Sequence, residues 1–496
     1  MGQPRILSID QGTSSTKAVL LDAQGTIHAT ASVPLASHYP RPGWAEQSAE
    51  AIWQSVRKAI ADIIAQAGSG EIVAIAIANQ RESLVVWDAA TGAPIGPCIL
   101  WQCLRTAEVS ARLHQHGHNA KVESRTGLSI NPLFPAAKLG WVMQHIPVAN
   151  ELLKQGRLRA GTVDSWLLWN LTAGTSFATD HSNASRTQLF DTRTLDWDAE
   201  LCELFGAPLA ALARPLPSDS AFGTTAGTTA LPSGIPVQAM MGDSHAALYG
   251  HGVRVPGIVK ATLGTGASLM ALTPERIASK SGLSGTIAWT EAGKTAYAIE
   301  GIIKVSGQAA AFVAATLGLG NAEALSDLAK TVDDSAGVTF VPALAGLGAP
   351  YWNDRATGSI DGLTLASTPA HIARATFDAI AMQVVDVFLA MERDTGQRLE
   401  SLLADGGASA NGFLMQLQAD LLGRPVTRKA MAEVGATGAA AMAFRALNID
   451  TVGLADSVQS QTFSPNLADA RRNAIHLAWS RAIEKLLAVS DRRGEM

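Results

Sequence analysis

The residues best suited to chemistry lie near the start of the chain, where Ile6–Leu20 reads ILSIDQGTSSTKAVL. Two apolar runs flank a polar stretch, which predicts a strand, a tight loop and a second strand. Gly12 lets the backbone approach a bound group, and donors follow it at Thr13, Ser14, Ser15 and Thr16. With the charge of Lys17, this loop suits a phosphate, and Asp10 is placed to reach a metal ion or water beside it. A plain polar hairpin turn is the alternative.

A second polar loop lies at Leu263–Ser268, between the apolar runs Ile258–Thr262 and Leu269–Leu272. Further along, Ser401–Ala404 is typical of a short strand; Asp405-Gly406-Gly407 follows it, and a helix is expected from about Asn411 to Leu422. The chain therefore has two halves that each open with a polar loop. We place the boundary near Gly250, which gives an N-terminal domain of residues 1–249 and a C-terminal domain of residues 250–496. A ligand held by two such halves would lie in a cleft.

Asp243 is the candidate for moving a proton. It lies in MMGDSHAAL, directly after the apolar run Ile235–Met241 and beside a glycine. A carboxylate at the end of a strand can point into a cleft and act as a general base. The alternative is that Asp243 is the N-cap of the Ala-rich helix that follows.

The elements around these residues alternate between strands and helices. Gly25–Ser32 predicts a third strand, Glu50–Ala67 has an apolar stripe at helical spacing, and Ile72–Ala78 is an apolar run typical of a buried strand. Leu467–Leu487 is a second amphipathic helix, near the C-terminal end. This order predicts an α/β fold.

Composition excludes several other classes of protein. The chain has 496 residues, 47% hydrophobic and 16% charged, which is ordinary for a globular protein of two to four domains. A net charge of −5 argues against nucleic acid and anionic membrane as partners. The three cysteines form no CxxC pair, and the sequence has neither a signal-peptide pattern nor a membrane-spanning run, so we expect a cytoplasmic protein.

Ten sequence blocks occur in the order typical of one family. The chain resembles the FGGY carbohydrate kinases, and within them most of all the glycerol kinases. The resemblance implies two ribonuclease-H/actin-like domains with a cleft between them, and a dimer or tetramer. The blocks are IDQGTSSTKAV, NQRES, LWQCLR, TGLSINPLFPAAKLGW, GTVDSWLLWNLT, TDHSNASRT, MGDSHAAL, LGTGASL, VPALAGLGAPYW and DGGASANGFLMQLQADLL.

The resemblance also implies ATP and Mg²⁺ as cofactors. It makes Asp243 the general base and an acceptor-binding residue, and it places Mg²⁺ near Asp10 and Asp243. Lys17 stands where glycerol kinases usually carry arginine, so the bidentate fork is lost. The residues implied to contact the nucleotide are Thr13, Ser14, Ser15, Lys17, Thr265, Gly266, Gly307, Gly407 and Asn411.

The implied acceptor pocket is where this chain departs from the glycerol kinases. Arg81 and Glu82 match the pair that binds glycerol hydroxyls, and Trp101 matches the apolar wall beside the carbon backbone. However, Leu133, Ser244 and Phe312 stand where glycerol kinases have tyrosine, glutamine and tryptophan. The first two changes shorten side chains and remove hydrogen-bond donors, each worth roughly 1–3 kcal/mol to a substrate hydroxyl.

Two acceptors are therefore open. The chain is either a divergent glycerol kinase or a kinase for a larger acceptor such as erythritol, xylulose or ribulose, to which His245 could donate a hydrogen bond. A non-kinase actin-like ATPase is a further alternative. The segment Phe222–Gly234 has no Lys or Arg, so we expect no inhibition by fructose 1,6-bisphosphate through it.

Other patterns are assigned structural roles. Trp166 and Trp169 have helical spacing and are expected in the core, with Asp164 capping their helix. The spacing of His114, His116 and His118 favours a solvated loop over a metal site. Asn183–Arg186 resembles a family loop and is assigned no chemistry.

Overall fold

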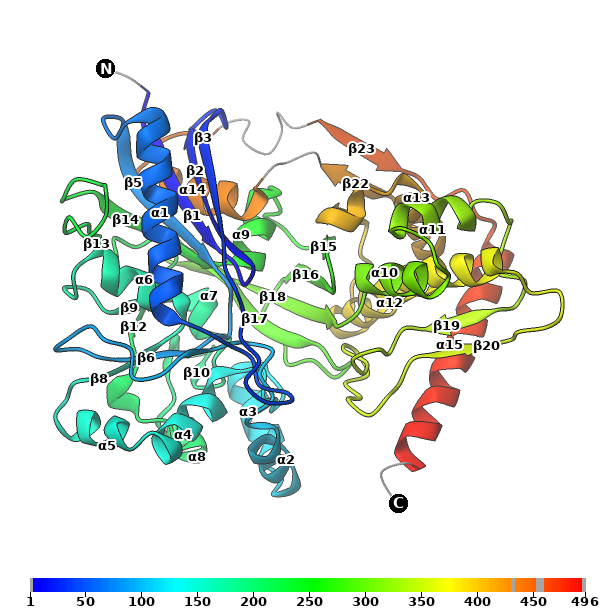
Figure 1. Cartoon of the computed structure of the whole chain (residues 1–496), viewed down its shortest axis with the longest axis horizontal. Coiled ribbons are helices and arrows are strands. Elements are labelled where there is room, and N and C mark those ends of the chain that lie inside the picture. The colour runs from blue at the N-terminus through cyan, green and yellow to red at the C-terminus, as the bar shows by residue number, and fades with distance from the viewer. Residues whose placement is uncertain (1–2, 430–432, 452–458, 493–496) are drawn as a thin grey trace. The chain divides into compact units, whose positions relative to one another are not determined.

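The computed structural model describes residues 3–429, 433–451 and 459–492, in two compact units (Figure 1). The first unit comprises Met1–Arg254, Gly285–Ala298 and Ala432–Ser457, and the second comprises Val255–Ser284, Ile299–Met431 and Val458–Met496. The single boundary that we placed between residues 249 and 250 stays a prediction. The grouping by contacts differs from it, because two later segments of the chain pack with the first unit.

The first unit is built on a six-stranded sheet with the order β13-β14-β5-β1-β2-β3. β1 pairs antiparallel with β2 and parallel with β5, and β5 pairs parallel with β14. The third strand predicted at Gly25–Ser32 is present as β3. The bounds are β1 Arg5–Gln11, β2 Ser15–Asp22, β3 Ile27–Pro34, β5 Ile72–Asn79, β13 Gly223–Thr224 and β14 Pro236–Gly242.

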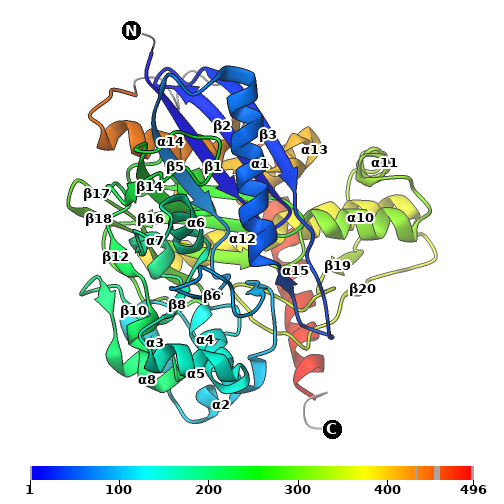
Figure 2. The same ribbon diagram turned by 60° about the vertical axis from the view of Figure 1, so that its left-hand side comes forward.

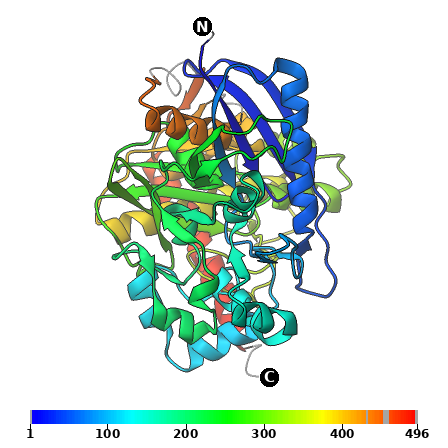
Figure 3. The same cartoon turned by 90° about the vertical axis from the view of Figure 1, so that its left-hand side faces the viewer.

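The two faces of this sheet carry different chemistry. Successive strand residues point to opposite faces, and Leu7 and Ile9 of β1 join the hydrophobic core with helix α1 (Ala49–Ala67). Ser8 points the other way, where its hydroxyl donates to the carbonyl of Ala436 in helix α14 (Val434–Ala446). β1 and β2 lie between α1 and α14 in Figures 2 and 3. Asp10 shares the face of Ser8 and is therefore directed towards α14.

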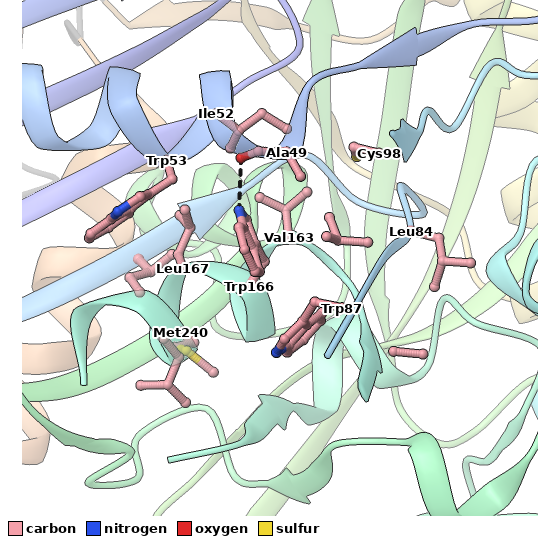
Figure 4. Packing of buried hydrophobic residues seen from close by; sticks show 14 of the residues in the cluster. Ala49, Ile52, Trp53, Leu84, Trp87, Cys98, Val163, Trp166, Leu167 and Met240 are labelled. Carbon is pink, nitrogen blue, oxygen red and sulfur yellow. Dashed lines mark hydrogen bonds between the residues drawn. The ribbon is translucent and has the colours of Figure 1, made fainter. Parts of the chain in front are cut away.

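The core of the first unit includes buried tryptophans, as the sequence predicted (Figure 4). Trp166 is buried and its indole N–H donates to the carbonyl of Ala49 over 2.9 Å, and its ring lies 5.3 Å from that of Trp87. Trp169 is partly buried and packs against the same core. The prediction for Asp164 is wrong, because Thr162 is the N-cap of α6 and the buried Asp164 carboxylate accepts from the hydroxyls of Thr162 and Thr179.

Smaller elements complete the first unit. Most lie between β5 and β14 along the chain, and helix α9 follows β14 directly. The helices are α2 Ala107–Gln115, α3 Asn119–Thr126, α4 Pro135–His145, α5 Pro147–Lys154, α6 Val163–Leu171, α7 His181–Ala184, α8 Ala199–Phe205 and α9 Asp243–Gly250. The strands are β4 Glu46–Gln47, β6 Val85–Asp88, β7 Cys98–Ile99, β8 Leu158–Gly161, β9 Ala178–Asp180, β10 Phe190–Asp191, β11 Asp196–Trp197 and β12 Arg214–Leu216.

The second unit repeats the motif of an antiparallel hairpin beside a parallel strand. β15 pairs antiparallel with β16 and parallel with β21, in a sheet of order β17-β18-β16-β15-β21-β22-β23. The strands of this unit are β15 Ile258–Leu263, β16 Ala267–Thr273, β19 Thr339–Val341, β20 Ser359–Asp361, β21 Ser401–Asp405, β22 Val426–Lys429 and β23 Ser460–Phe463. β17 (Ser284–Glu291) and β18 (Lys294–Ile303) continue the sheet, although Gly285–Ala298 groups with the first unit by its contacts. The helices are α10 Gly307–Thr316, α11 Ala322–Ala329, α12 Pro369–Thr395, α13 Gly412–Leu422 and α15 Asp469–Arg492.

The predicted α/β class with two domains is confirmed, since each unit has a mixed sheet and helices. The helices predicted at Glu50–Ala67, Asn411–Leu422 and Leu467–Leu487 are present as α1, α13 and α15. Within the residues that the structure describes, none of the helices has the length and apolar character needed to cross a membrane.

Candidate active site

The carboxylate of Asp10 lies at the end of β1 against the start of α14. A Cβ atom at Gly435 would lie 2.8 Å from Asp10 Oδ2, so only glycine allows α14 to come this close. Burial, the largest cause, together with the nearby carboxylates of Asp243 and Glu433, raises the pKa of Asp10 to about 7, while Lys17 opposes the rise. Because the Asp243 carboxylate disfavours the charged form of Asp10, a cation beside the two carboxylates would stabilise the site.

Lys17 is opposite Asp10 in the β1–β2 pairing, so its ammonium is near the same end of the sheet. Its Nζ lies 2.8 Å from Oε2 of Glu433, the N-cap residue of α14. The Lys17 side chain is 42% exposed, and exposed ion pairs are weak. The charge therefore remains available to an anion, and the role of Lys17 in phosphate binding stays a prediction.

The first polar loop is shorter than the sequence suggested. Only Gly12, Thr13 and Ser14 lie between β1 and β2, and the Gly12 N–H donates to the Ser15 carbonyl to close the turn. Thr16 is buried within β2, and its hydroxyl is 2.6 Å from that of Ser55 in α1. Our suggestion that Thr16 offers a donor to a bound group is therefore wrong, because alternation along the strand turns it to the core side.

Asp243 is the first residue of α9, directly after β14. Gly242 is the N-cap, so the N-cap interpretation of Asp243 is wrong. Its Oδ1 accepts from the backbone N–H of Ser244 at 2.6 Å and from Arg81 Nε at 3.1 Å. The side chain is 40% exposed. A carboxylate that is oriented by a guanidinium and still reaches solvent can accept a proton from a bound hydroxyl.

Arg81 and Glu82 follow β5 and are both buried. A Cβ at Gly242 would lie 2.6 Å from Arg81 Cδ, so this glycine makes room for the guanidinium beside Asp243. Glu82 has a φ of 60°, which is strained for a residue with a side chain. Its Oε1 accepts from Nε of Arg186 over 2.7 Å. The pair is therefore held in place by residues on distant elements.

Arg186 is a site residue that sequence reasoning missed. It is fully buried, pairs with Glu82, and lies with its guanidinium carbon 5.2 Å from the ring centre of Phe134. We had assigned no chemistry to Asn183–Arg186. The sequence does contain a signal for it: Arg186 is the only charged residue in the segment ASRT. A cation in a buried segment needs an anionic partner.

Trp101 is linked directly to the first polar loop. Its indole N–H donates to the hydroxyl of Thr13 over 3.1 Å, and that hydroxyl lies 3.2 Å from Oε1 of Gln80, as a donor. Gln47 also donates, to the carbonyl of Thr13 over 2.6 Å. The Thr13 side chain is thus engaged with the predicted acceptor wall, and its contact with ATP phosphates stays a prediction.

Leu133 and Ser244, the residues that replace the tyrosine and glutamine of glycerol kinases, also lie in the first unit. Both residues are half-buried. The Leu133 N–H donates to Asn131 Oδ1 and its carbonyl accepts from Lys138, so its backbone is fixed from two sides. His245 is buried, and its Nε2 lies 3.1 Å from the hydroxyl of Thr286. His245 therefore belongs to the core rather than to a solvent-facing pocket.

In the second unit, the loop between β15 and β16 meets the start of α10. The carbonyl of Thr265 accepts from the N–H groups of Ser306 and Gln308. A Cβ at Gly266 would lie 2.6 Å from the carbonyl oxygen of Ile303, and one at Gly307 would lie 2.7 Å from that of Gly264. Both glycines are needed for this close approach, and their contacts with nucleotide stay predictions.

The glycines after β21 lie beside the same loop, because Thr262 of β15 pairs with Asp405 of β21. Gly406 has a φ of 84°, and a Cβ there would lie 2.5 Å from the carbonyl oxygen of Leu263. A Cβ at Gly407 would meet open space. Asn411 caps α13 by accepting from the Leu414 N–H, and its Nδ2 donates to Ser326 Oγ. Gly407 is thus exposed enough for a ligand, whereas Asn411 already serves α13.

The metal site predicted at Asp10 and Asp243 is compatible with the side chains present there. No group of three His, Cys, Asp or Glu residues that could hold a metal occurs in the described part of the chain. Mg²⁺ is typically bound through one or two carboxylates, with waters and substrate phosphates as its other ligands. Two neighbouring carboxylates fit that pattern, and the assignment of Mg²⁺ to them stays a prediction.

Known proteins resemble the whole chain. The FGGY family of carbohydrate kinases matches through its N-terminal domain at residues 5–250 and its C-terminal domain at residues 259–447. A glycerol kinase from Symbiobacterium thermophilum is 42% identical over 492 residues, covering 98% of this chain and 99% of that protein. An apulose kinase from Pectobacterium atrosepticum is 46% identical over 442 residues, or 89% of each. The crystal structure of Plasmodium falciparum glycerol kinase with ADP superimposes with a TM-score of 0.91 at 29% identity, covering 98% of both chains.

Proposed function

Because the chain belongs to the FGGY family of carbohydrate kinases, we propose that it transfers the γ-phosphoryl group of ATP to a terminal hydroxyl of glycerol or a related small polyol or sugar, with Asp243 as the general base. The family resemblance and the kinase class predicted from the sequence blocks are confirmed by these matches. The observation that carries the proposal is the position of Asp243: it is solvent-accessible, bonded to Arg81, and near a second carboxylate, Asp10.

The proposed mechanism assigns one task to each group. Asp243 accepts the proton of the acceptor hydroxyl as the oxygen attacks the γ-phosphorus. Arg81 holds the Asp243 carboxylate in one orientation through Nε. Mg²⁺, when bound near Asp10 and Asp243, would neutralise phosphate charge. Lys17 would add a positive charge beside the same phosphates.

The acceptor would lie between a charged pair and an apolar wall. Glu82 and Arg81 can each bind one or two hydroxyls, and the Trp101 ring would cover the carbon chain. The indole N–H of Trp101 is used by Thr13, so the ring contributes its face rather than its donor. This arrangement suits a short polyhydroxylated chain.

A larger acceptor is the competing candidate. Leu133 and Ser244 are smaller and less polar than the tyrosine and glutamine that we associate with glycerol kinases, which leaves room and removes hydroxyl partners. The relatives include proteins named for glycerol and for apulose. Erythritol, xylulose, ribulose and apulose are therefore the compounds to compare with glycerol.

A substrate panel decides between them. ADP release would be measured in a coupled assay with each candidate acceptor: glycerol, erythritol, threitol, xylulose, ribulose and apulose. A parallel reaction without any acceptor gives the background rate. A kcat/KM for any rival about tenfold above that for glycerol would reject glycerol as the preferred acceptor. ADP release that no acceptor stimulates would instead favour the actin-like ATPase.

The catalytic role is tested by Asp243→Asn, which keeps the side-chain size and removes the base. We expect kcat to fall by about 10²–10⁴-fold, because a general base contributes that much. The affinity for ATP, measured by calorimetry, should stay within about twofold. Near-normal turnover in this variant would rule out the mechanism.

We also propose that the protein acts in the cytoplasm as a dimer or tetramer that needs Mg²⁺. The family resemblance supports the oligomer, and the three buried free thiols fit a reducing compartment. Light scattering would give the oligomeric state, and loss of turnover with EDTA that Mg²⁺ restores would support the metal.

A further inference from the structure

Lys138 is a buried lysine that contacts two residues of the proposed acceptor pocket. It lies on α4 and is fully buried. Its Nζ donates to the carbonyl of Glu82 over 2.9 Å and to the carbonyl of Leu133 over 2.6 Å. Both acceptors belong to residues that line the proposed pocket, although they are on separate segments of the chain.

We propose that Lys138 is a positioning residue that fixes the acceptor pocket by tying the backbone of Glu82 to that of Leu133. The inference rests on the proposed function, since it concerns how that site holds its acceptor. Lys138 itself does not touch the reacting atoms in this scheme. It sets the distance between Glu82, whose carboxylate would bind acceptor hydroxyls, and Leu133, which stands where glycerol kinases have tyrosine.

The conformation of Glu82 explains why such a bond is needed. Its φ of 60° is strained, and a strained residue persists only where its surroundings hold it. Two buried basic side chains hold Glu82 from opposite ends: Arg186 Nε binds the carboxylate and Lys138 Nζ binds the carbonyl. Arg186 thus orients the side chain, while Lys138 orients the backbone from which it projects.

The Lys138 side chain also fixes the loop that carries Leu133. The next residue, Phe134, is the N-cap of α4, and Arg186 lies over its ring. The segment at Leu133 is therefore bound by Lys138 through its carbonyl and packed against Arg186 through its neighbour. Both contacts join it to Glu82, so Lys138 and Arg186 hold the two sides of the proposed pocket together.

Burial of a lysine is unfavourable unless its N–H groups are satisfied. Desolvation lowers the pKa of Lys138 to about 7, and the ionisable groups that influence it are Glu82, Cys98, Cys103 and Arg105. A neutral amine still carries two N–H donors, which equals the two carbonyls that it binds. Both protonation states can therefore keep the bridge.

The test is Lys138→Met, which keeps the length of the side chain and removes its donors. The KM for the best acceptor of the panel should rise by about 10–100-fold, because two buried carbonyls lose their partner. The KM for ATP at saturating acceptor should stay within about twofold. Lys138→Gln, which retains an NH₂ donor, should recover part of the acceptor affinity, and it replaces the methionine variant if that variant does not fold.

The matched control is Leu139→Ala, the next residue on α4, which is equally buried in the core. It should lower the melting temperature while leaving the acceptor KM within about twofold. An unchanged acceptor KM in folded Lys138→Met, or equal increases in the KM values for acceptor and ATP, would overturn the proposal. Failure of the wild-type protein to phosphorylate any acceptor would instead reject the proposed function.

Discussion

Single residues in the first unit decide which charges the site can hold. Asp243 and Lys17 lie close enough to Asp10 to influence its ionisation, and Arg81 bonds the carboxylate that we propose as the base. A cation between the two carboxylates would relieve their repulsion. Burial and this repulsion are an electrostatic strain on Asp10 that a bound cation would reduce.

That strain gives a pH-dependent prediction for Asp10→Asn. The folded-state pKa of about 7 exceeds the ordinary value of 3.8, so the wild-type free energy of unfolding falls as pH rises from about 4 to about 7. Asparagine carries no charge, so the free energy of unfolding of the Asp10→Asn variant should not fall in this way as the pH rises. We expect Asp10→Asn to gain about 1–3 kcal/mol at pH 8 and much less at pH 4 in urea unfolding.

The same substitution should impair catalysis, since a proposed Mg²⁺ ligand is lost. We expect kcat to fall by about 10–100-fold at saturating ATP. Gln24→Asn, an exposed change beyond the site, serves as the control and should alter neither property. Equal gains in stability at pH 4 and pH 8 would contradict the raised pKa.

At the scale of elements, the site depends on the packing of α9 against α14. Gly250 and Gly438 are located where the two helices meet: a Cβ at Gly438 would lie 1.8 Å from the carbonyl oxygen of Ala246, and one at Gly250 would lie 2.5 Å from that of Val434. α9 carries Asp243 and α14 carries the Gly435 that faces Asp10. Close packing of two helices thus sets the distance between the carboxylates.

Gly438→Ala should therefore separate these helices. The inserted methyl group meets backbone rather than a flexible side chain, so we expect a loss of about 2–4 kcal/mol in the free energy of unfolding. Gly70→Ala is the matched control, because a Cβ there meets nothing within 4 Å. Thermal unfolding of both variants measures the difference, and equal melting temperatures would contradict the close packing.

At the scale of the whole molecule, the question is how the kinase is regulated. The segment Phe222–Gly234 includes β13 and is held by hydrogen bonds of its own, such as that from the Thr225 hydroxyl to the carbonyl of Pro232. It contains no Lys or Arg. A doubly phosphorylated sugar would find no cation there.

We therefore expect turnover to be unaffected by millimolar fructose 1,6-bisphosphate. Steady-state rates with and without the compound, at subsaturating acceptor, measure this. Inhibition that disappears when Thr224–Thr229 is replaced would show that the segment binds the phosphates without a cationic side chain.

Much of the fold could be predicted from the sequence, because each pattern is local. The apolar runs at β1, β5 and β15 and the helical stripe of α1 depend on residues adjacent in the chain, and the structure has these elements. The ordered blocks likewise indicated the family, since each block is a continuous segment. Errors occurred where neighbours in space decided the outcome, as with Thr16, which faces Ser55 in α1.

The sequence by itself determined that the protein is an FGGY kinase, and it supplied the candidate residues from Asp10 to Asn411. Only the tertiary structure decided how the acceptor residues are held. Arg186 meets Glu82 across 104 positions, Lys138 meets it across 56, and Lys17 meets Glu433 across 416. No local pattern encodes such pairs, because a buried cation is stabilised by whichever carbonyl or carboxylate the folded chain brings to it.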